Sequence, residues 1–267
     1  MIPSAHVIKR TAKSQLKNNW VSAIVVAVLF MLVVNFFGVL LGLMISFFYG
    51  EHKLIMLLRI AISVIYGITV FSVVIPLFHG TLRWFWHLGL EKKLPLGDLF
   101  YYFSEGKLYI KSLSFYVLLL GKILMLTVLC VLPAAVVRIL PEILERFLLD
   151  VDSYGMLFHF ASVVLLILGF AVAFVLSMQY FSAPVLAIIG EEKEIDEILG
   201  VSRELQLSRA SCMGFIASFL GWIALSYLGL PLLYTLPYFI MSYVVAVRFA
   251  VTNHRYDMSR WGLPPLI

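Results

Sequence analysis

Residues 9–48 read KRTAKSQLKNNWVSAIVVAVLFMLVVNFFGVLLGLMISFF, a basic segment followed by an apolar run that starts at Trp20. The run exceeds the roughly 20 residues that a helix needs to cross a bilayer, so it predicts a membrane span. It is also longer than a signal-peptide core and lacks an A-x-A cleavage pattern, so we expect the span to be retained. Further apolar runs follow, and the complete set predicts six spans: Trp20–Phe48, Leu54–Leu82, Ile110–Val137, Met156–Ile189, Ser211–Leu228 and Leu232–Val251.

The positions of lysine and arginine predict on which side of the membrane each connection between the runs lies. Of the 20 cationic residues, 15 fall at the N-terminus, in every second gap or at the C-terminus. The other gaps hold only Lys53, Arg59, Arg138 and Arg146, and Lys122 lies inside a run. Because short cytoplasmic loops carry the excess of Lys and Arg, the pattern predicts that both termini are cytoplasmic. The 15 residues are Lys9, Arg10, Lys13, Lys17, Arg83, Lys92, Lys93, Lys107, Lys111, Lys193, Arg203, Arg209, Arg248, Arg255 and Arg260.

The composition favours one integral membrane domain over residues 1–267. The chain is 62% hydrophobic and 13% charged, whereas roughly a quarter of the residues in soluble globular proteins are charged. Six spans of about 20 residues leave room for connections but for no separate catalytic domain. The net charge of +5 predicts attraction to anionic headgroups at the inner face. We expect no nucleic-acid binding, because the sequence has no dense basic patch.

Motifs for catalysis and for metal binding are absent from the sequence. It has no H-E-x-x-H, G-x-S-x-G, Walker or dinucleotide-binding pattern, and no Ser/His or paired-Asp arrangement stands out. His79, His87 and His159 are scattered over different depths without nearby carboxylates, so no metal site is predicted. Cys130 and Cys212 are expected at opposite ends of their spans, too far apart for a disulfide. We therefore expect a protein that is not an enzyme and needs no cofactor.

A short polar segment precedes each pair of spans, at residues 4–19, 94–108 and 191–209. The predicted architecture is all-α, with three helical hairpins that each follow a short cytoplasmic amphipathic or polar helix. In the third segment the acidic residues from Glu191 onward come first, an order that suits the helix dipole. The second and third units also share weak identities at a spacing of 100, which leaves open duplication or chance. The pairs are Leu99 with Leu199, Phe115 with Phe215, Leu120 with Leu220, Gly121 with Gly221, and Ile123 with Ile223.

Lys122 is the main candidate for a polar or ligand site within the membrane. It lies 11 residues beyond Lys111, about 16 Å along a helix, near the middle of the bilayer. No acidic residue lies within a span to pair with it, so carbonyls, tyrosines or an anionic ligand would have to serve. Two interpretations stay open, a snorkelling or neutral buried amine and a cavity lysine that binds an anionic substrate or headgroup. Asn35 and Gln179 are weaker candidates that can hydrogen-bond between helices.

Small residues predict close helix packing, and prolines predict kinks. Spans one and two each contain a small-x-x-x-small pair, which favours packing within the first hairpin over homodimerisation. The pairs are Gly38 with Gly42 and Ser63 with Gly67. Pro76 and Pro184 are expected to kink spans two and four near their inner ends. Mixed charges between residues 138 and 152 predict a short amphipathic helix on the outer surface.

The C-terminal third carries a family resemblance. Its residues are Ser177-Met178-x-Tyr180-x-x-Ala183-Pro184, Ser202-Arg203-x-Leu205, Ser218-Phe219-x-Gly221-Trp222-Ile223-x-Leu225, Gly229 and Pro237-Tyr238, together with Leu16-Lys17-x-Asn19-Trp20 near the start. This pattern resembles a bacterial integral membrane family, domain of unknown function nine-seven-five. Asn18 and Ser208 replace a usual glycine, and Gln206 replaces a usual methionine. The resemblance implies a six-helix fold in the bacterial plasma membrane and brings no catalytic residues.

Three functions are compatible with these observations. We expect a non-enzymatic scaffold or accessory subunit in envelope maintenance, acting on a membrane protein partner or a second copy. One alternative is a small transporter or lipid-handling protein with a cavity around Lys122. The family's distant similarity to the membrane domain of some glycerophosphodiester phosphodiesterases adds lipid handling by analogy. The other alternative is an immunity or resistance protein against membrane-active peptides.

Overall fold

A computed structural model describes residues 4–47, 53–90, 95–145, 155–205, 209–226, 229 and 231–253, and in these ranges the chain forms helices and turns but no strand. A short outer turn is expected between the first two spans, from Gly50 to Lys53; its residues 50–52 lie outside the described residues, and Lys53 begins α3. The C-terminal residues 254–267 also lie outside them. The elements are α1 (Ala5–Leu16), α2 (Trp20–Phe47), α3 (Lys53–Gly89), η1 (Leu96–Phe100), α4 (Tyr101–Ser104), α5 (Gly106–Glu145), α6 (Gly155–Ser177), η2 (Met178–Tyr180), α7 (Ala183–Ile189), α8 (Ile195–Glu204), α9 (Arg209–Ala217), α10 (Leu220–Ser226) and α11 (Leu232–Asn253).

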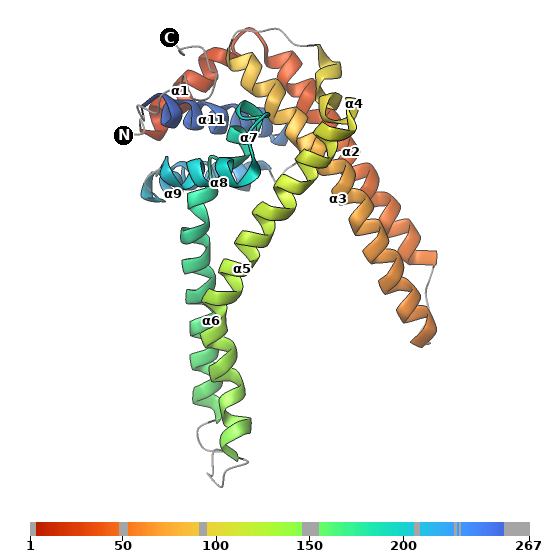
Figure 1. Ribbon diagram of the computed structural model, residues 1–267, viewed down its shortest axis with the longest axis vertical. Coiled ribbons are helices and arrows are strands. Elements are labelled where there is room, and N and C mark those ends of the chain that lie inside the picture. The colour runs from red at the N-terminus through yellow and green to blue at the C-terminus, as the bar shows by residue number, and fades with distance from the viewer. Residues whose placement is uncertain are drawn as a thin grey trace.

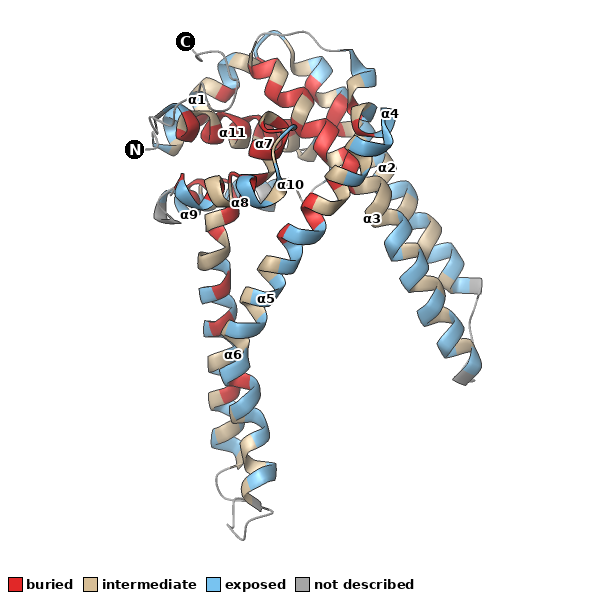
Figure 2. Cartoon of the chain, viewed as in Figure 1, coloured by how far each residue is buried: buried red, intermediate tan, exposed pale blue. Residues whose placement is uncertain are grey.

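The helices form two arms that diverge from a packed head (Figure 1). The first arm is the outer part of α2 with α3, and the second is the outer part of α5 with α6. The head contains the short helices, α11 and the adjoining ends of α2, α3 and α5. Buried residues concentrate in the head, whereas both arms are largely exposed (Figure 2). The exposed arm residues are mostly large and apolar, as expected of helices that contact lipid.

Among the described residues, five helices are long and apolar enough to cross a membrane, so the expectation of six is not confirmed. The expected span not found among the described residues is the fifth. Its residues form α9 and α10, of 9 and 7 residues, each far shorter than the roughly 20 residues that a crossing requires. The sixth expected span corresponds to α11, which qualifies by length although more than half of its apolar window is buried in the head.

A short helix precedes each of the three units in the order expected. α1 comes before α2 and α3, η1 with α4 before α5 and α6, and α8 before α9 to α11. α1 buries Ile8, Ala12 and Leu16 and packs against α11. α8 buries Ile198 and Leu199 while its first turn stays acidic. These short helices close the head by covering the ends of the long ones.

The burial pattern repeats at the same spacing of 100 that the sequence identities suggest. Leu99 and Leu199 are both buried, and so are Phe115 and Phe215, while Leu120 and Leu220 are both exposed. The agreement extends beyond the identical pairs to Tyr102 with Ser202, Ser112 with Cys212, and Leu119 with Phe219, all of them buried. Equivalent positions therefore face equivalent surroundings, which favours duplication over chance matches between apolar segments.

The predicted small-residue contacts are wrong for the first arm. A Cβ atom added at Gly38, Gly42 or Gly67 would meet nothing within 4 Å, so none of these glycines lies at a close helix contact. The close approach occurs in the second arm instead, where a Cβ at Gly169 would lie 2.6 Å from the Cys130 carbonyl oxygen. Gly–x–x–x–Gly spacing alone did not distinguish a packed face from a face turned outward.

The helices around the two prolines, and the segment from residue 138, also differ in part from the prediction. Pro76 lies inside α3, which continues through it. Pro184 occupies the first turn of α7, directly after the chain leaves α6 through η2. α5 runs to Glu145, so the separate outer helix expected from residue 138 is wrong up to that point. Residues 146–152 of that expectation lie outside the described residues.

The close crossing at Gly169 predicts a strong response to a single methyl group. We expect Gly169→Ala to lower the free energy of unfolding by about 1–3 kcal/mol, because two backbones must separate to admit the Cβ. Unfolding in mixed micelles with increasing denaturing detergent measures this difference. Gly121→Ala is the matched control in α5, where a Cβ meets nothing within 4 Å, and equal losses in both variants would contradict the packing.

Candidate functional site

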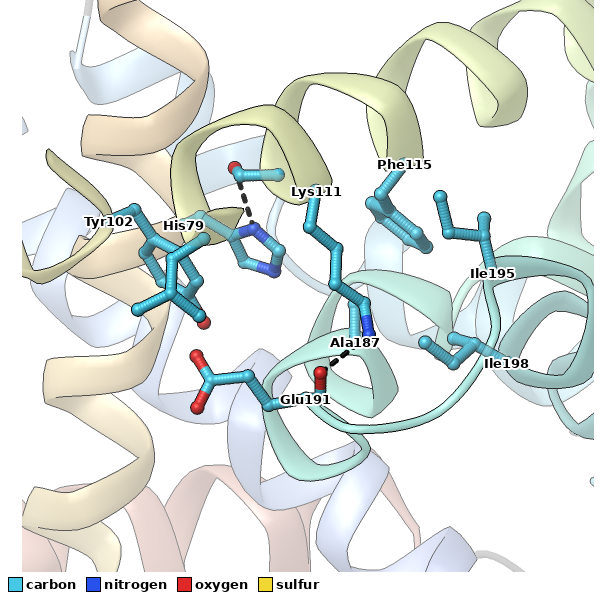
Figure 3. Close-up of a pocket in the computed structure, with 10 residues that line it drawn as sticks. His79, Tyr102, Lys111, Phe115, Ala187, Glu191, Ile195 and Ile198 are labelled. Carbon is cyan, nitrogen blue, oxygen red and sulfur yellow. Dashed lines mark hydrogen bonds between the residues drawn. The ribbon is translucent and has the colours of Figure 1, made fainter. Parts of the chain in front are cut away.

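A buried polar cluster lies where α3, α4, α5 and the segment after α7 meet (Figure 3). α3 contributes His79, α4 contributes Tyr102, and α5 contributes Lys111 and Ser112, while Glu191 follows α7. α3 and η1 approach closely here, since a Cβ at Gly80 would collide with the Leu99 carbonyl. We call these five residues, together with Arg83 and Tyr101, the junction cluster.

His79 is 2% exposed and is surrounded by aromatic rings. Its Nδ1 atom lies 2.9 Å from Ser112 Oγ, and the tautomer decides which atom donates the hydrogen bond. The imidazole stacks on the Tyr102 ring with centroids 4.5 Å apart, and it meets Tyr116 edge-on at 5.5 Å. The sequence interpretation that no Ser/His arrangement stands out missed this pair, because 33 residues separate its members.

A serine beside a histidine can act as nucleophile and base, but the surroundings of this pair oppose that role. Ser112 is 1% exposed, and the adjoining pocket has room for about one water molecule. A substrate carbonyl could therefore not reach Ser112 Oγ without opening the junction. The geometry supports a structural or hydrogen-bonding role for the pair.

Glu191 connects the part of the junction cluster that contains Arg83 and Tyr101. Its Oε2 atom pairs with Arg83 Nη1 at 3.4 Å and accepts a hydrogen bond from the Tyr101 hydroxyl at 3.3 Å. The Arg83 guanidinium also lies over the Tyr101 ring, 3.4 Å from its centroid. The three side chains thus connect α3, α4 and the end of α7. At 18% and 24% exposure the ion pair is only partly screened by water.

Lys111 connects α5 to the same segment through the backbone. Its Nζ atom donates to the carbonyl oxygens of Glu191 at 2.5 Å and Lys193 at 2.6 Å. These carbonyls follow the end of α7, where the helix no longer supplies donors to its last carbonyl groups. A lysine near a helix C-terminus also interacts favourably with the helix dipole.

The Tyr102 hydroxyl is buried and faces the Glu191 carboxylate (Figure 3). Burial, and secondarily the negative charge of Glu191, raise the pKa of this phenol well above its ordinary value. Tyr102 therefore stays protonated and can donate a hydrogen bond. The hydroxyl lies close to the Glu191 carboxylate but forms no hydrogen bond of good geometry with it or with another described residue.

Lys122 has an acidic partner, which the sequence interpretation did not foresee. Its Nζ atom lies 2.7 Å from Asp196 Oδ1 in the first turn of α8. The expectation that carbonyls, tyrosines or an anionic ligand must serve is wrong, because Asp196 comes from outside the spans. The lysine side chain is 31% exposed and the aspartate 79%. Neither residue lines the pocket at His79.

The remaining sequence candidates do not join these sites. Asn35 is exposed on α2, and its Nδ2 donates to the Met31 carbonyl of the same helix. Gln179 contributes its backbone carbonyl, which accepts a hydrogen bond from Ser202 Oγ. Cys130 and Cys212 are both free, in agreement with the prediction. No group of His, Cys, Asp or Glu within the described ranges is arranged to hold a metal ion.

Replacing Lys111 tests whether its amine fastens the α7–α8 segment. We expect Lys111→Met to lower the free energy of unfolding by about 1.5–3 kcal/mol, because two carbonyls lose a charged donor. Lys107→Met, one turn earlier on an exposed part of α5, is the matched control and should change little. Detergent unfolding curves of both variants measure the effect, and similar curves would count against the assignment.

The ion pair with Lys122 lowers the pKa of the Asp196 carboxyl below its ordinary value of 3.8. Any stabilisation from the pair is therefore present above that value and is lost as the pH falls through the lowered pKa. We expect a carbon-13 NMR titration of Asp196 to show the low midpoint, and Lys122→Met to return it towards 3.8. A midpoint that does not respond to this substitution, or that responds equally to Lys107→Met, would refute the pairing.

Comparison with models of protein families, with curated proteins and with solved structures finds no match for this chain. The two sites are therefore interpreted from their own residues. The junction cluster binds helix ends to one another, and the Lys122–Asp196 pair fastens α8 to α5. Neither arrangement contains an accessible nucleophile with its base.

Proposed function

We propose that this chain is a non-enzymatic protein of the bacterial plasma membrane that serves as a scaffold or accessory subunit in envelope maintenance. Under this proposal it is a member of the unknown-function family that its sequence resembles. The apolar helices support a membrane location. The packed head and the pocket with room for about one water molecule favour a structural role over turnover of a substrate.

The observation that carries the proposal is the separation of the arms. Both leave the same head, diverge, and expose large apolar side chains along their length (Figures 1 and 2). In lipid these faces carry no hydrophobic driving force of their own, so another helix packs on them by shape and small polar contacts. Two separated faces on one packed head suit a protein that positions membrane partners.

The proposed orientation places the head at the inner membrane face, with both termini cytoplasmic. Lys122 then lies near the inner interface instead of the middle of the bilayer. From Lys122 to Glu145, α5 has 23 further residues, about 34 Å of helix, which suffices to cross a hydrocarbon core of about 30 Å. The cations of the head would then lie within reach of anionic headgroups.

A small transporter or lipid-handling protein is the second candidate. The observation in its favour is the Lys122–Asp196 pair, a partly exposed ion pair on one of the long apolar helices. Ionisable residues in such helices often mark a transport path. The pairing itself weakens this reading, because Asp196 already neutralises the amine that would attract an anion.

Photocrosslinking along the arms tests the scaffold proposal. A benzophenone amino acid replaces the exposed Phe36 in α2 or Phe160 in α6, and the exposed Phe100 of η1 serves as the control in the head. We expect the same membrane protein, or a second copy of the chain, to be captured from at least one arm and not from Phe100. Capture of lipid alone at both arm positions would contradict the proposal.

Lipid transfer in vesicles separates the two candidates. For a scaffold we expect fluorescent phosphatidylglycerol to cross the bilayer no faster than in protein-free vesicles. Lys122→Leu should leave that rate and the photocrosslinks unchanged. Transfer that the protein accelerates and that Lys122→Leu abolishes would establish the transport function in its place.

A further inference from the structure

One nitrogen of His79 lacks a hydrogen-bond partner in the described part of the chain. Nδ1 is engaged by Ser112 Oγ, but Nε2 is buried and unpaired. The Pro184 carbonyl lies close to the imidazole without forming a hydrogen bond of good geometry to Nε2. A buried polar atom with no partner is costly, so such an atom calls for a bound group.

Two other buried polar atoms of the junction cluster share this condition. The Tyr102 hydroxyl and Glu191 Oε1 have no partner among the described residues. Figure 3 shows His79, Tyr102, Lys111 and Glu191 arranged around one space, closed on its other side by Phe115 and Ile198. The residues that carry these three atoms come from α3, α4 and the segment after α7, and all three line the pocket.

The chemistry of the residues that line the pocket indicates which kind of molecule binds there. Lys111 contributes a positive charge that two backbone carbonyls already engage, and Glu191 contributes a negative charge that Arg83 already engages. Tyr102 offers a donor, Glu191 an acceptor, and His79 Nε2 is either one, depending on the tautomer. A neutral molecule that both donates and accepts fits this set. The space admits about one water molecule.

We propose that the pocket is a water-binding site, in which one ordered water molecule hydrogen-bonds to His79 Nε2 and links it to Tyr102 and Glu191. This goes beyond the proposed function and does not depend on it. The water completes a chain from Ser112 through His79 to Glu191, whose side chain is 24% exposed. It thereby gives a deeply buried imidazole a hydrogen-bonded connection to solvent.

Solution NMR of the full chain in nanodiscs tests the site. Histidine is labelled, and His79→Gln identifies the His79 signals among those of the 6 histidines. We expect the ring C–H protons of His79 to show magnetisation transfer from a long-lived water, whichever tautomer is present. No transfer from water to His79 in the unsubstituted protein, with Nε2–H donating to the Pro184 carbonyl instead, would overturn the proposal.

Two phenylalanine substitutions make the test specific. Tyr102→Phe keeps the ring stacked on His79 and removes the hydroxyl, so we expect the water signal at His79 to weaken at least several-fold. Tyr116→Phe removes a buried, unpaired hydroxyl from the ring that meets His79 edge-on and is outside the pocket lining. It should leave the signal unchanged. Equal effects of the two substitutions, in proteins with native histidine shifts, would refute the assigned position.

Discussion

Partly buried carbonyl groups at or just beyond helix ends are the constraint on which this head depends. Helices that stop inside an apolar environment leave carbonyls without intrahelical donors. Three cations supply these donors from distant parts of the chain. Arg248 donates to the Gly89 carbonyl at the end of α3, Lys9 to Ser218 between α9 and α10, and Lys111 to Glu191 after α7. Without such partners, short helices could not end within the core.

These contacts also explain how the repeated units hold one another. Lys9 lies in the first unit and donates a hydrogen bond to a carbonyl of the third unit. Arg248 lies in the third unit and donates a hydrogen bond to a carbonyl of the first. The second unit joins through Lys111, which binds the segment leading into the third. Lysine and arginine that mark the predicted inner side in the sequence thus do more than set topology. They close the units into one head, from which both arms diverge.

The sequence was informative where periodicity and length decide the structure. It predicted the long apolar helices, the short helices before them and the unpaired cysteines. It failed where the partner lies far along the chain: Asp196 beside Lys122 is 74 residues away, and no spacing rule connects them. The prediction also failed at Gly38. A Gly-x-x-x-Gly pair permits close contact with another helix, but the pair does not show that a helix packs on that face. At the break between α9 and α10, the Ser218 carbonyl accepts a hydrogen bond from Lys9, 209 residues away in the sequence.

At the sequence spacing of 100, His79 corresponds to Gln179, Tyr102 to Ser202, and Ser112 to Cys212. At the second of these junctions, Ser202 bonds directly to Ser182 Oγ and to the Gln179 carbonyl, and none of these groups is a buried polar atom without a partner. The first junction places a histidine and a tyrosine at equivalent positions, where His79 Nε2 and the Tyr102 hydroxyl have no partner among the described residues. Packing alone does not require that difference, because the serine junction closes the same kind of helix contact with smaller groups. The His79 junction therefore differs in chemistry from its counterpart at the spacing of 100, and His79 is buried where Gln179 is only partly buried.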